Sequence, residues 1–526
     1  MKNFFLLLCL FCSQIVEGQH LNERYHFDYP STIFTSLIST DSAYYVNGLV
    51  ADTTYFNQSA SVFAKMDFNG NPHWLRVLNS PNETYETWDG DLIDLQGEGF
   101  MINGYGFDTN MYALIIRYNT YGEFLWGKKI RNGFNEENFI RATSLIQIDS
   151  SFLLSLREVN SNGNGNNDIG FLKIDSEGET IWRKSYGSIT LREYPYSSAY
   201  LHENAYLIGG YQTNNNVTNQ YYLSRAIIFE VDSLGNKRWE WKSPEDELWD
   251  GANAMVPSGD GGVVVASGKG IEEYVNPAMN ILLWKNMTIF KLNENHQLAW
   301  QTNFYPSNLR GFNNKLNQII KVSDGSGYIA TGQYVQVHYD VVDSIGVPAG
   351  DIYGFIAKVN AEGDSLWTRR LNYVTEIGEG RQYLYDIEET SDGGFVLCGQ
   401  VLDEQLNIHY QQAWLIKVDE YGCIVPGCQI VSGLKEAEKK KVKMLLYPNP
   451  AQDNLNVFLS DQLARQRNKI ALRILNQQGQ VIDYFPITPN KEITHIIPIA
   501  HYPAGTYFLQ YLEGGKTLES QSFVKH

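Results

Sequence analysis

A tight turn that precedes a tryptophan recurs along the chain, and this repeat limits the possible folds more than any other feature. In the copy at residues 173–182, KIDSEGETIW, the aspartate suits the first position of a type I turn, and the glycine supplies the positive φ that closes it. A sixth copy uses Asn295 and Trp300, one residue further apart, because asparagine also tolerates the left-handed conformation. A seventh, ending at Gly422, has the turn without the tryptophan. The five pairs with a glycine four residues before the tryptophan are Gly70/Trp74, Gly122/Trp126, Gly178/Trp182, Gly235/Trp239 and Gly363/Trp367.

The spacing of the copies favours a β-propeller. The tryptophans follow one another at intervals of about 50 to 70 residues, and each interval contains about four short strand signals. Repeats of this kind are typical of propeller blades, each of which is a small sheet. No convincing helical pattern precedes residue 430. The sequence therefore predicts an all-β fold in which residues 19–430 form a seven-bladed β-propeller.

The N-terminal segment is predicted to close the ring. Residues 24–31, RYHFDYPS, resemble residues 301–307, QTNFYPS, which follow the tryptophan of the sixth copy. The seventh copy lacks its own tryptophan strand. We therefore expect the N-terminal strand to complete blade seven, which would remove the exposed sheet edges that favour aggregation.

Three shorter segments complete the predicted organisation. Residues 1–18 are expected to be a signal peptide, since Lys2 precedes an apolar run and small residues precede a cleavage point at Gly18. Residues 431–446 are rich in charge and are expected to be a linker. Residues 447–526 show short strand signals and frequent turns, which predict a small immunoglobulin-like antiparallel β-sandwich. No other segment is apolar enough to predict a transmembrane span.

The net charge limits the kinds of partner that the protein can bind, and the cysteines fit an exported chain. The net charge is −18, and the acidic excess lies before residue 431, which argues against nucleic acid or anionic lipid as a partner. Cys423 and Cys428 flank a Pro-Gly turn in an exported chain, so a disulfide is expected. A metal site is the alternative, but two cysteines without a nearby histidine make a poor one. Cys398 lies in an apolar strand and is expected to be a buried thiol.

A series of aromatic residues suggests a binding site. Roughly a dozen residues before the second strand signal of several copies stands an aromatic, with acidic or arginine residues beside it. If the first strand of each blade lines the channel, these side chains would surround its mouth, where they suit a sugar or a peptide. The alternative is that the aromatics only pack neighbouring blades. The predicted binding residues are Trp88, Asp89, Phe139, Arg141, Tyr194, Trp249, Asp250, Arg381 and Tyr383.

Catalytic patterns are weak. The histidines show no metal-ligand spacing, and neither a Gly-x-Ser-x-Gly motif nor a phosphate-binding loop is present. Asp89 and Asp91 lack the rest of a calcium loop. Asp89 with Glu98, or Asp250 with Glu245, remains a candidate carboxylate pair, whose separation the sequence does not give. No catalytic residue, cofactor or metal site is therefore predicted.

The C-terminal segment closely resembles the C-terminal sorting domain (type A) of type IX secretion substrates. The resemblance implies export through the periplasm by the signal peptide, and then passage across the outer membrane directed by the type IX machinery. In that family the domain is usually cut off, and the cargo is released or attached to surface lipopolysaccharide. The residues that carry the resemblance are Tyr447, Pro448, Asn449, Pro450, Gly479, Gly505, Tyr507 and Lys525.

The repeats resemble, more loosely, those of quinoprotein-like bacterial propellers, in which a Gly-x-x-x-Trp turn docks one blade on the next. Enzymes of that family would imply a quinone cofactor, calcium and a catalytic aspartate. The vicinal cysteine pair and the eighth copy of those enzymes are missing here, so the resemblance supports the fold and not that chemistry.

Together these features predict a secreted or surface-attached propeller that binds an extracellular glycan or protein. A secreted enzyme, acting on glycans or as an oxidoreductase, is one alternative, and a structural component of the cell surface is another. The fold alone does not choose among them, because propellers host many functions.

Overall fold

The computed structural model divides the chain into two compact units, residues 1–430 and 431–526. It describes residues 21–52, 58–88, 90–131, 139–159, 167–188, 190–214, 225–245, 247, 249–274, 282–304, 314–342, 348–375, 380–403, 406, 411–424, 428, 444–459, 470–487, 494–513 and 516–526. The predicted signal peptide and nearly all of the predicted linker lie outside these residues.

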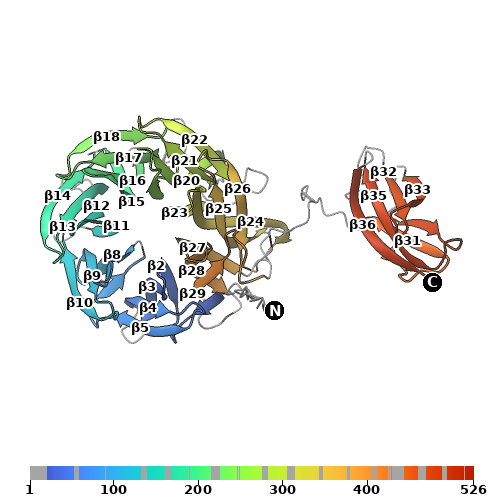
Figure 1. Cartoon of the computed structure of the whole chain (residues 1–526), viewed down its shortest axis with the longest axis horizontal. Coiled ribbons are helices and arrows are strands. Elements are labelled where there is room, and N and C mark those ends of the chain that lie inside the picture. The colour runs from blue at the N-terminus through green and yellow to red at the C-terminus, as the bar shows by residue number, and fades with distance from the viewer. Residues whose placement is uncertain are drawn as a thin grey trace, which may run out of the picture. The chain divides into compact units, whose positions relative to one another are not determined.

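Every regular element among the described residues is a β-strand, so the predicted all-β class is confirmed. The same residues contain no helix that is long and apolar enough to cross a membrane. In the first unit the sheets stand side by side around a central opening (Figure 1). The first strand of each sheet lies toward the centre, and the last strand lies at the outer edge.

Five of the sheets in the first unit are separate, and each is built from consecutive strands. The first contains β2 (Thr32–Ser39), β3 (Tyr44–Asp52), β4 (Gln58–Met66) and β5 (Pro72–Leu78). The second contains β6 (Thr84–Glu86), β7 (Leu92–Asp94), β8 (Phe100–Phe107), β9 (Met111–Tyr118) and β10 (Phe124–Ile130). The third contains β11 (Ile140–Ile148), β12 (Ser151–Val159), β13 (Asn167–Ile174) and β14 (Thr180–Tyr186). The fourth contains β15 (Leu191–His202), β16 (Ala205–Asn214), β17 (Arg225–Val231) and β18 (Lys237–Lys242). The fifth contains β19 (Ala254–Pro257), β20 (Val263–Tyr274), β21 (Leu282–Leu292) and β22 (Leu298–Phe304).

The remaining strands of this unit form an eight-stranded sheet with two groups of four. The first group is β23 (Lys315–Lys321), β24 (Tyr328–Val342), β25 (Pro348–Val359) and β26 (Ser365–Leu371). The second group is β27 (Gly380–Glu389), β28 (Phe395–Asp403), β29 (Gln411–Val418) and β1 (Asn22–Tyr25). One parallel bridge, between Ile352 and Arg381, joins the groups.

The burial of each strand follows its place in the sheet. The middle strand β9 is buried along nearly its whole length, whereas the outer strand β10 alternates exposed and half-buried residues. A strand covered on both faces needs a continuous apolar run, and a strand with one face in water needs alternation. The hydrophobic clusters accordingly combine side chains of neighbouring sheets, as Met101 of β8 and Leu154 of β12 show.

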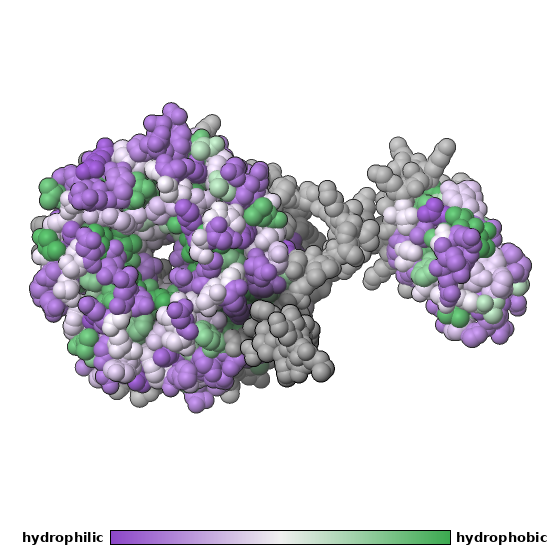
Figure 2. Space-filling view, viewed as in Figure 1, coloured by the Kyte–Doolittle hydropathy of each residue, from purple (hydrophilic) through white to green (hydrophobic). Residues whose placement is uncertain are grey.

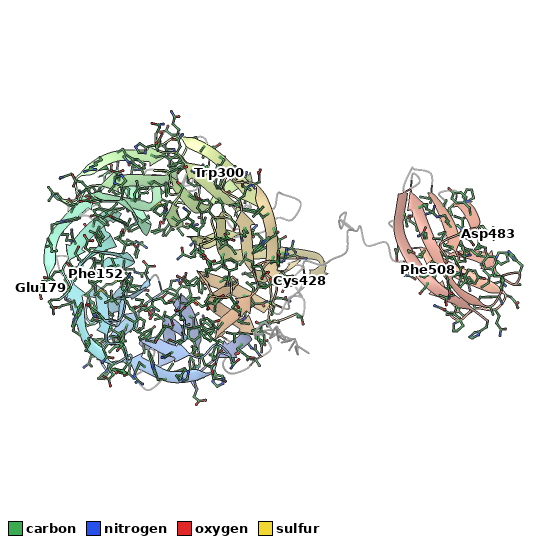
Figure 3. The ribbon with its side chains drawn as sticks, in the orientation of Figure 1. Phe152, Glu179, Trp300, Cys428, Asp483 and Phe508 are labelled. Carbon is green, nitrogen blue, oxygen red and sulfur yellow. A yellow bond between two sulfur atoms is a disulfide. The ribbon has the colours of Figure 1, made fainter. Side chains whose placement is uncertain are left out.

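The repeated glycine and tryptophan hold neighbouring sheets together. A Cβ atom at Gly122 would overlap the ring of Trp74, and one at Gly235 would lie 2.8 Å from the ring of Trp182. These glycines also have positive φ angles, so both the turn and the contact require glycine. Trp300, labelled at the outer edge of the ring in Figure 3, meets Gly363 in the same way.

The sixth turn differs from the sequence prediction. The residue with positive φ is His296, at 61°, and not Asn295. Its N–H donates to the carbonyl of Asn293, so the turn has the same length as the others and the spacing to Trp300 is again four residues. The ring of Trp239 stacks on the His296 imidazole at 3.8 Å between centroids, which replaces the usual tryptophan–glycine contact.

The N-terminal strand pairs with a strand nearly 400 residues away in the sequence. β1 lies antiparallel to β29, with Asn22 opposite Ile416. The Tyr25 hydroxyl donates to the carbonyl of Gly70 at 2.8 Å, so Tyr25 occupies on the first sheet the place that a tryptophan takes elsewhere. This strand therefore connects the last group of strands with the first sheet.

The cysteines have the predicted states. Cys423 and Cys428 form a disulfide with a Cα–Cα distance of 5.6 Å, which confirms that prediction. Cys398 on β28 is a free, buried thiol, and burial raises its pKa well above the usual value.

The second unit contains two antiparallel sheets. One contains β30 (Met444–Tyr447), β31 (Asn454–Leu459) and β34 (Thr494–Pro498). The other has the order β33 (Val481–Ile487), β32 (Ile470–Leu475), β35 (Gly505–Glu513) and β36 (Lys516–Lys525). Side chains from both sheets, among them Leu455 and Leu509, share one hydrophobic cluster.

Candidate functional site

The first strand of most sheets in the first unit contains a β-bulge at the same place. A bulge leaves one residue unpaired and directs its side chain away from the normal alternation. In five of the groups of strands described above, the ladder with the second strand skips one residue. The skipped residues are Thr35, Thr143, Tyr196, Asn317 and Tyr385.

A glycine on the second strand makes the bulge possible in four of these groups. Gly399 pairs with Leu384, the residue before the bulge, and a Cβ at this glycine would overlap the carbonyl oxygen of Tyr383. Gly48, Gly210 and Gly332 stand in the same relation to their first strands. The sequence shows this signal as a glycine in the middle of the second strand, and the sequence analysis missed it.

The bulged residues surround a cavity of about 210 Å³ at the centre of the ring. Figure 2 shows the opening between the side chains in the middle of the first unit. All seven groups of strands contribute to the wall, which is mainly polar, with the rings of Trp88, Tyr196 and Tyr385 among the hydroxyl and amide groups. The hydroxyl and amide side chains in the wall are Thr35, Ser36, Thr143, Ser144, Ser197, Ser198, Asn253, Asn317 and Gln318.

Several polar groups of the wall also join one sheet to the next. Asn317 Nδ2 donates to the carbonyl of Leu384 at 2.7 Å, and Asn253 Nδ2 donates to the carbonyl of Leu316 at 3.0 Å. Further contacts of this kind include Thr35 Oγ1 to the Thr87 carbonyl, Ser197 Oγ to the Ala252 carbonyl, Leu145 N–H to Asp91 and Leu37 N–H to Asp386. Asp91 and Asp386 are thus tied to backbone N–H groups, which fixes both carboxylates.

Burial shifts the pKa values of two acidic side chains on β27, the first strand of the last group. It raises the pKa of Asp386 to about 6, although the N–H groups of Leu37 and Ile387 and the Gln318 side chain lower it in part. Burial and the charges of Asp386 and Glu389 raise the pKa of Glu388, two residues further along β27, to about 8. The described residues contain no group of three or more His, Cys, Asp or Glu side chains placed to hold a metal ion.

Two of the predicted binding residues lie at or beside the cavity. Trp88 lines it, remains 41% exposed, and has its ring 5.6 Å from the ring of Tyr385. Tyr383 lies parallel to Tyr385, with 6.3 Å between centroids. Asp89 lies outside the described residues.

Trp249 does not take the predicted position at the mouth of the channel. It is 2% exposed and packs edge-on against Phe290 and Trp241, in a cluster built from the fourth and fifth sheets. Its indole N–H donates to Glu247 at 3.0 Å. The aromatic here fills the space between two sheets, which was the alternative interpretation, and it cannot stack on a ligand. The N–H of the following Asp250 donates to the carbonyl of Gly268.

Three other predicted residues come together in what we call the aromatic–arginine row. Phe139, Arg141 and Tyr194 lie with Tyr105, Arg157 and Tyr211, which the sequence analysis did not select. Each guanidinium group lies over two rings, and Arg381, exposed on β27, is not part of the row. The successive distances are 4.0 Å for Tyr105–Arg141, 4.6 Å for Arg141–Phe139, 4.9 Å for Phe139–Arg157, 4.2 Å for Arg157–Tyr194 and 4.5 Å for Tyr194–Tyr211.

The second unit shows the predicted sorting motifs on well-defined turns and strands. Gly479 has a φ of 76° in the β32–β33 turn, and the Tyr507 hydroxyl donates to the carbonyl of Pro503 at 2.9 Å. Residues 445–525 match the family of secretion system C-terminal sorting domains. The second unit is a type IX sorting domain. This domain implies export of the chain to the cell surface or secretion.

Comparison of the whole chain with known proteins shows likeness of fold. A polysaccharide lyase, Uly1, is 8% identical, with 73% of this chain and 90% of the lyase covered and a TM-score of 0.41. The BP39L lectin from Burkholderia pseudomallei is 8% identical, with 73% and 98% covered and a TM-score of 0.42. The β-propeller domain of the Trilobed protease from Pyrococcus furiosus is 11% identical, with 74% and 99% covered and a TM-score of 0.38. The comparison with curated proteins returned no match.

Proposed function

We propose that this type IX substrate is an extracellular glycan-binding protein whose first unit is a seven-bladed propeller with the ligand site in its central cavity. In this proposal residues 1–18 direct the chain into the periplasm, residues 19–430 form the propeller, and β1 completes its seventh blade. Residues 431–446 link it to an immunoglobulin-like sandwich at 447–526, which directs passage across the outer membrane.

The exposed ring of Trp88 carries the proposal. An indole that stays 41% exposed inside a polar wall offers one apolar surface among many hydrogen-bonding groups. A sugar has the matching character, because its ring has an apolar face and its edge carries hydroxyl groups. The cavity, at about 210 Å³, is smaller than the roughly 300–1,000 Å³ of sites that enclose drug-sized ligands. It therefore suits one sugar unit or the end of a chain.

The two carboxylates in the wall favour binding over hydrolysis. Glycoside hydrolysis generally needs one carboxyl group as acid and a second as base or nucleophile. Asp91 and Asp386 instead accept backbone N–H groups of the neighbouring sheets at 2.7 and 2.8 Å. Their positions support a structural role, so an enzyme acting on glycans remains the alternative that we favour less.

A glycan array with the full chain and one variant tests the proposal. We expect Trp88→Ala to weaken binding at least about tenfold, because stacking on an aromatic is worth about 1–3 kcal/mol, while the melting temperature stays nearly unchanged. Tyr121→Ala is the control, since Tyr121 is 73% exposed and does not line the cavity. If no glycan binds, or if Trp88→Ala binds as tightly as the parent, the proposed site is wrong.

A further inference from the structure

The aromatic–arginine row continues into the central cavity. Tyr211, its last member, lies 5.2 Å from the ring of Tyr196, which is one of the residues of the cavity wall. The Lys315 ammonium group, also in the wall, lies 5.3 Å from the centre of the Tyr196 ring. A chain of contacts therefore leads from Tyr105 on the second sheet to Lys315 on β23.

This path carries three positive charges, and the described residues pair none of them with a carboxylate. Elsewhere in the same unit arginines are paired, as Arg24 is with Asp403 and Arg131 with Asp108. In the row, Arg157 Nε donates only a long hydrogen bond of 3.4 Å to Asn167, and Arg141 Nε lies 3.4 Å from the Met111 sulfur. Such an arrangement is unexpected in a chain of net charge −18.

The shape of the guanidinium group decides which ligand groups it can bind. Arg157 lies over the rings of Phe139 and Tyr194, and Arg141 lies over the rings of Tyr105 and Phe139. The N–H donors of a guanidinium group lie in its plane. A planar fork of donors matches a carboxylate or a sulfate, which accepts two parallel hydrogen bonds.

We propose that the row and Lys315 bind the acidic groups of a polyanionic glycan, one unit of which stacks on Trp88. This inference rests on the proposed function and specifies its ligand. Two acidic side chains of the cavity wall, Asp91 and Asp386, are bonded to backbone N–H groups, and the charge of Asp250 acts on Tyr211. Because the whole chain is acidic, general attraction does not draw in a polyanion, and recognition depends on these fixed cations.

Matched pairs of probes test the role of charge. We would measure binding of the full chain to oligogalacturonate and to its methyl ester, and to a heparin oligomer and its desulfated, N-acetylated and carboxyl-reduced form. One charged probe is expected to bind at least tenfold more tightly than its neutralised partner. Arg141→Gln and Arg157→Gln should each remove most of this difference. Arg131→Gln is the matched control, because Arg131 also lies over a tyrosine ring but is paired with Asp108.

The outcomes separate this inference from the proposed function. If a neutral probe binds as tightly as its charged partner and Trp88→Ala weakens both, the glycan site stands and the acidic specificity is wrong. The specificity is equally wrong if Arg131→Gln weakens binding as much as Arg157→Gln does. If none of the four probes and no glycan of the array binds, both proposals fail. A melting curve for each variant shows whether a lost interaction reflects unfolding.

Discussion

At the scale of single residues, two tryptophans with the same sequence context have opposite environments. Each is followed by an aspartate and stands before the second strand of its repeat. Trp88 projects into the central cavity and is 41% exposed, whereas Trp249 lies between two sheets and is 2% exposed. The first is available to a ligand and the second contributes to stability.

We therefore expect Trp249→Ala to destabilise the first unit by about 3–5 kcal/mol, as truncation of a buried aromatic usually does. Trp88→Ala should cost less, about 1 kcal/mol, since 41% of Trp88 is already exposed. Denaturant unfolding of the two variants beside the parent measures both values. Equal losses of stability would show that Trp88 is a packing residue as well.

Glu388 gives a prediction for pH. Its pKa rises from the ordinary 4.5 to about 8 in the folded chain because of burial and the nearby charges of Asp386 and Glu389. The folded chain thus binds more protons than the unfolded chain between these values, and its stability falls as the pH rises from 4.5 to 8. Glu388→Gln removes this penalty and should stabilise the chain by about 1–3 kcal/mol at pH 8 but by little at pH 4.

Thermal melting of Glu388→Gln at the two pH values checks this expectation. Glu177→Gln is the control, since Glu177 is exposed on the β13–β14 turn. A shift of the same size at pH 4 and pH 8 would mean that the effect comes from packing and not from the charge of Glu388.

At the scale of elements, the bulge of the first strand and the glycine of the second form one unit. The bulge turns a polar or aromatic side chain into the cavity, and the glycine leaves room for the displaced backbone. The third sheet is the exception, because Leu156 stands where the glycine would be, opposite Ala142.

We expect Gly399→Ala to cost about 2–3 kcal/mol, because the added Cβ would overlap the backbone of Tyr383 and force one strand to move. Gly127→Ala is the matched control. That glycine lies on the outer strand β10, where a Cβ would meet its nearest atom at 3.6 Å, so the change should stay within about 1 kcal/mol. Urea unfolding of both variants measures these losses of stability. An unchanged midpoint for Gly399→Ala would show that the bulge does not require glycine at this position.

At the scale of the whole molecule, the beginning and the end of the first unit are joined by two contacts, one near the centre of the ring and one toward its outer edge. Near the centre, Asp386 of β27 accepts the N–H of Leu37 in the first sheet. Toward the outside, Tyr25 of β1 bonds to Gly70. Both contacts link segments that lie far apart in the sequence, so the strength of the ring depends on its closure.

Deletion of residues 20–29 should therefore lower the melting temperature of the whole first unit. The deletion removes β1, exposes the edge of β29 and leaves Gly70 without its tyrosine. Thermal melting compares the truncated and full chains. An unchanged midpoint would show that the N-terminal strand is not needed for closure.

Removal of residues 447–526 should leave a folded first unit that stays in the periplasm. Each unit has its own hydrophobic clusters, and the sorting domain supplies the export signal. Cell fractionation followed by a melting curve of the retained protein provides the measurement. Arrival of the truncated chain at the cell surface would show that another segment directs export.

Features that depend on local backbone geometry could be predicted from the amino-acid pattern alone. A residue with positive φ must be glycine or one of a few alternatives, so the turns, their period and the all-β class are visible as a pattern. The residue with positive φ in the sixth turn was predicted to be Asn295 but is His296. The sequence shows that the turn needs a residue with positive φ, but it does not show which position has it. The sorting motifs and the disulfide were equally local.

Only the tertiary structure decided which side chains form the site. Trp88 and Trp249 differ in what the neighbouring sheet places against them, and no local pattern contains that information. Arg157 faces Arg141 across the β11–β12 ladder, but it meets Tyr194 only because the second strand of one sheet ends beside the first strand of the next. The exposure of a side chain and the identity of its neighbours depend on residues that are far apart in the sequence. Both are therefore set only when the sheets pack around the ring.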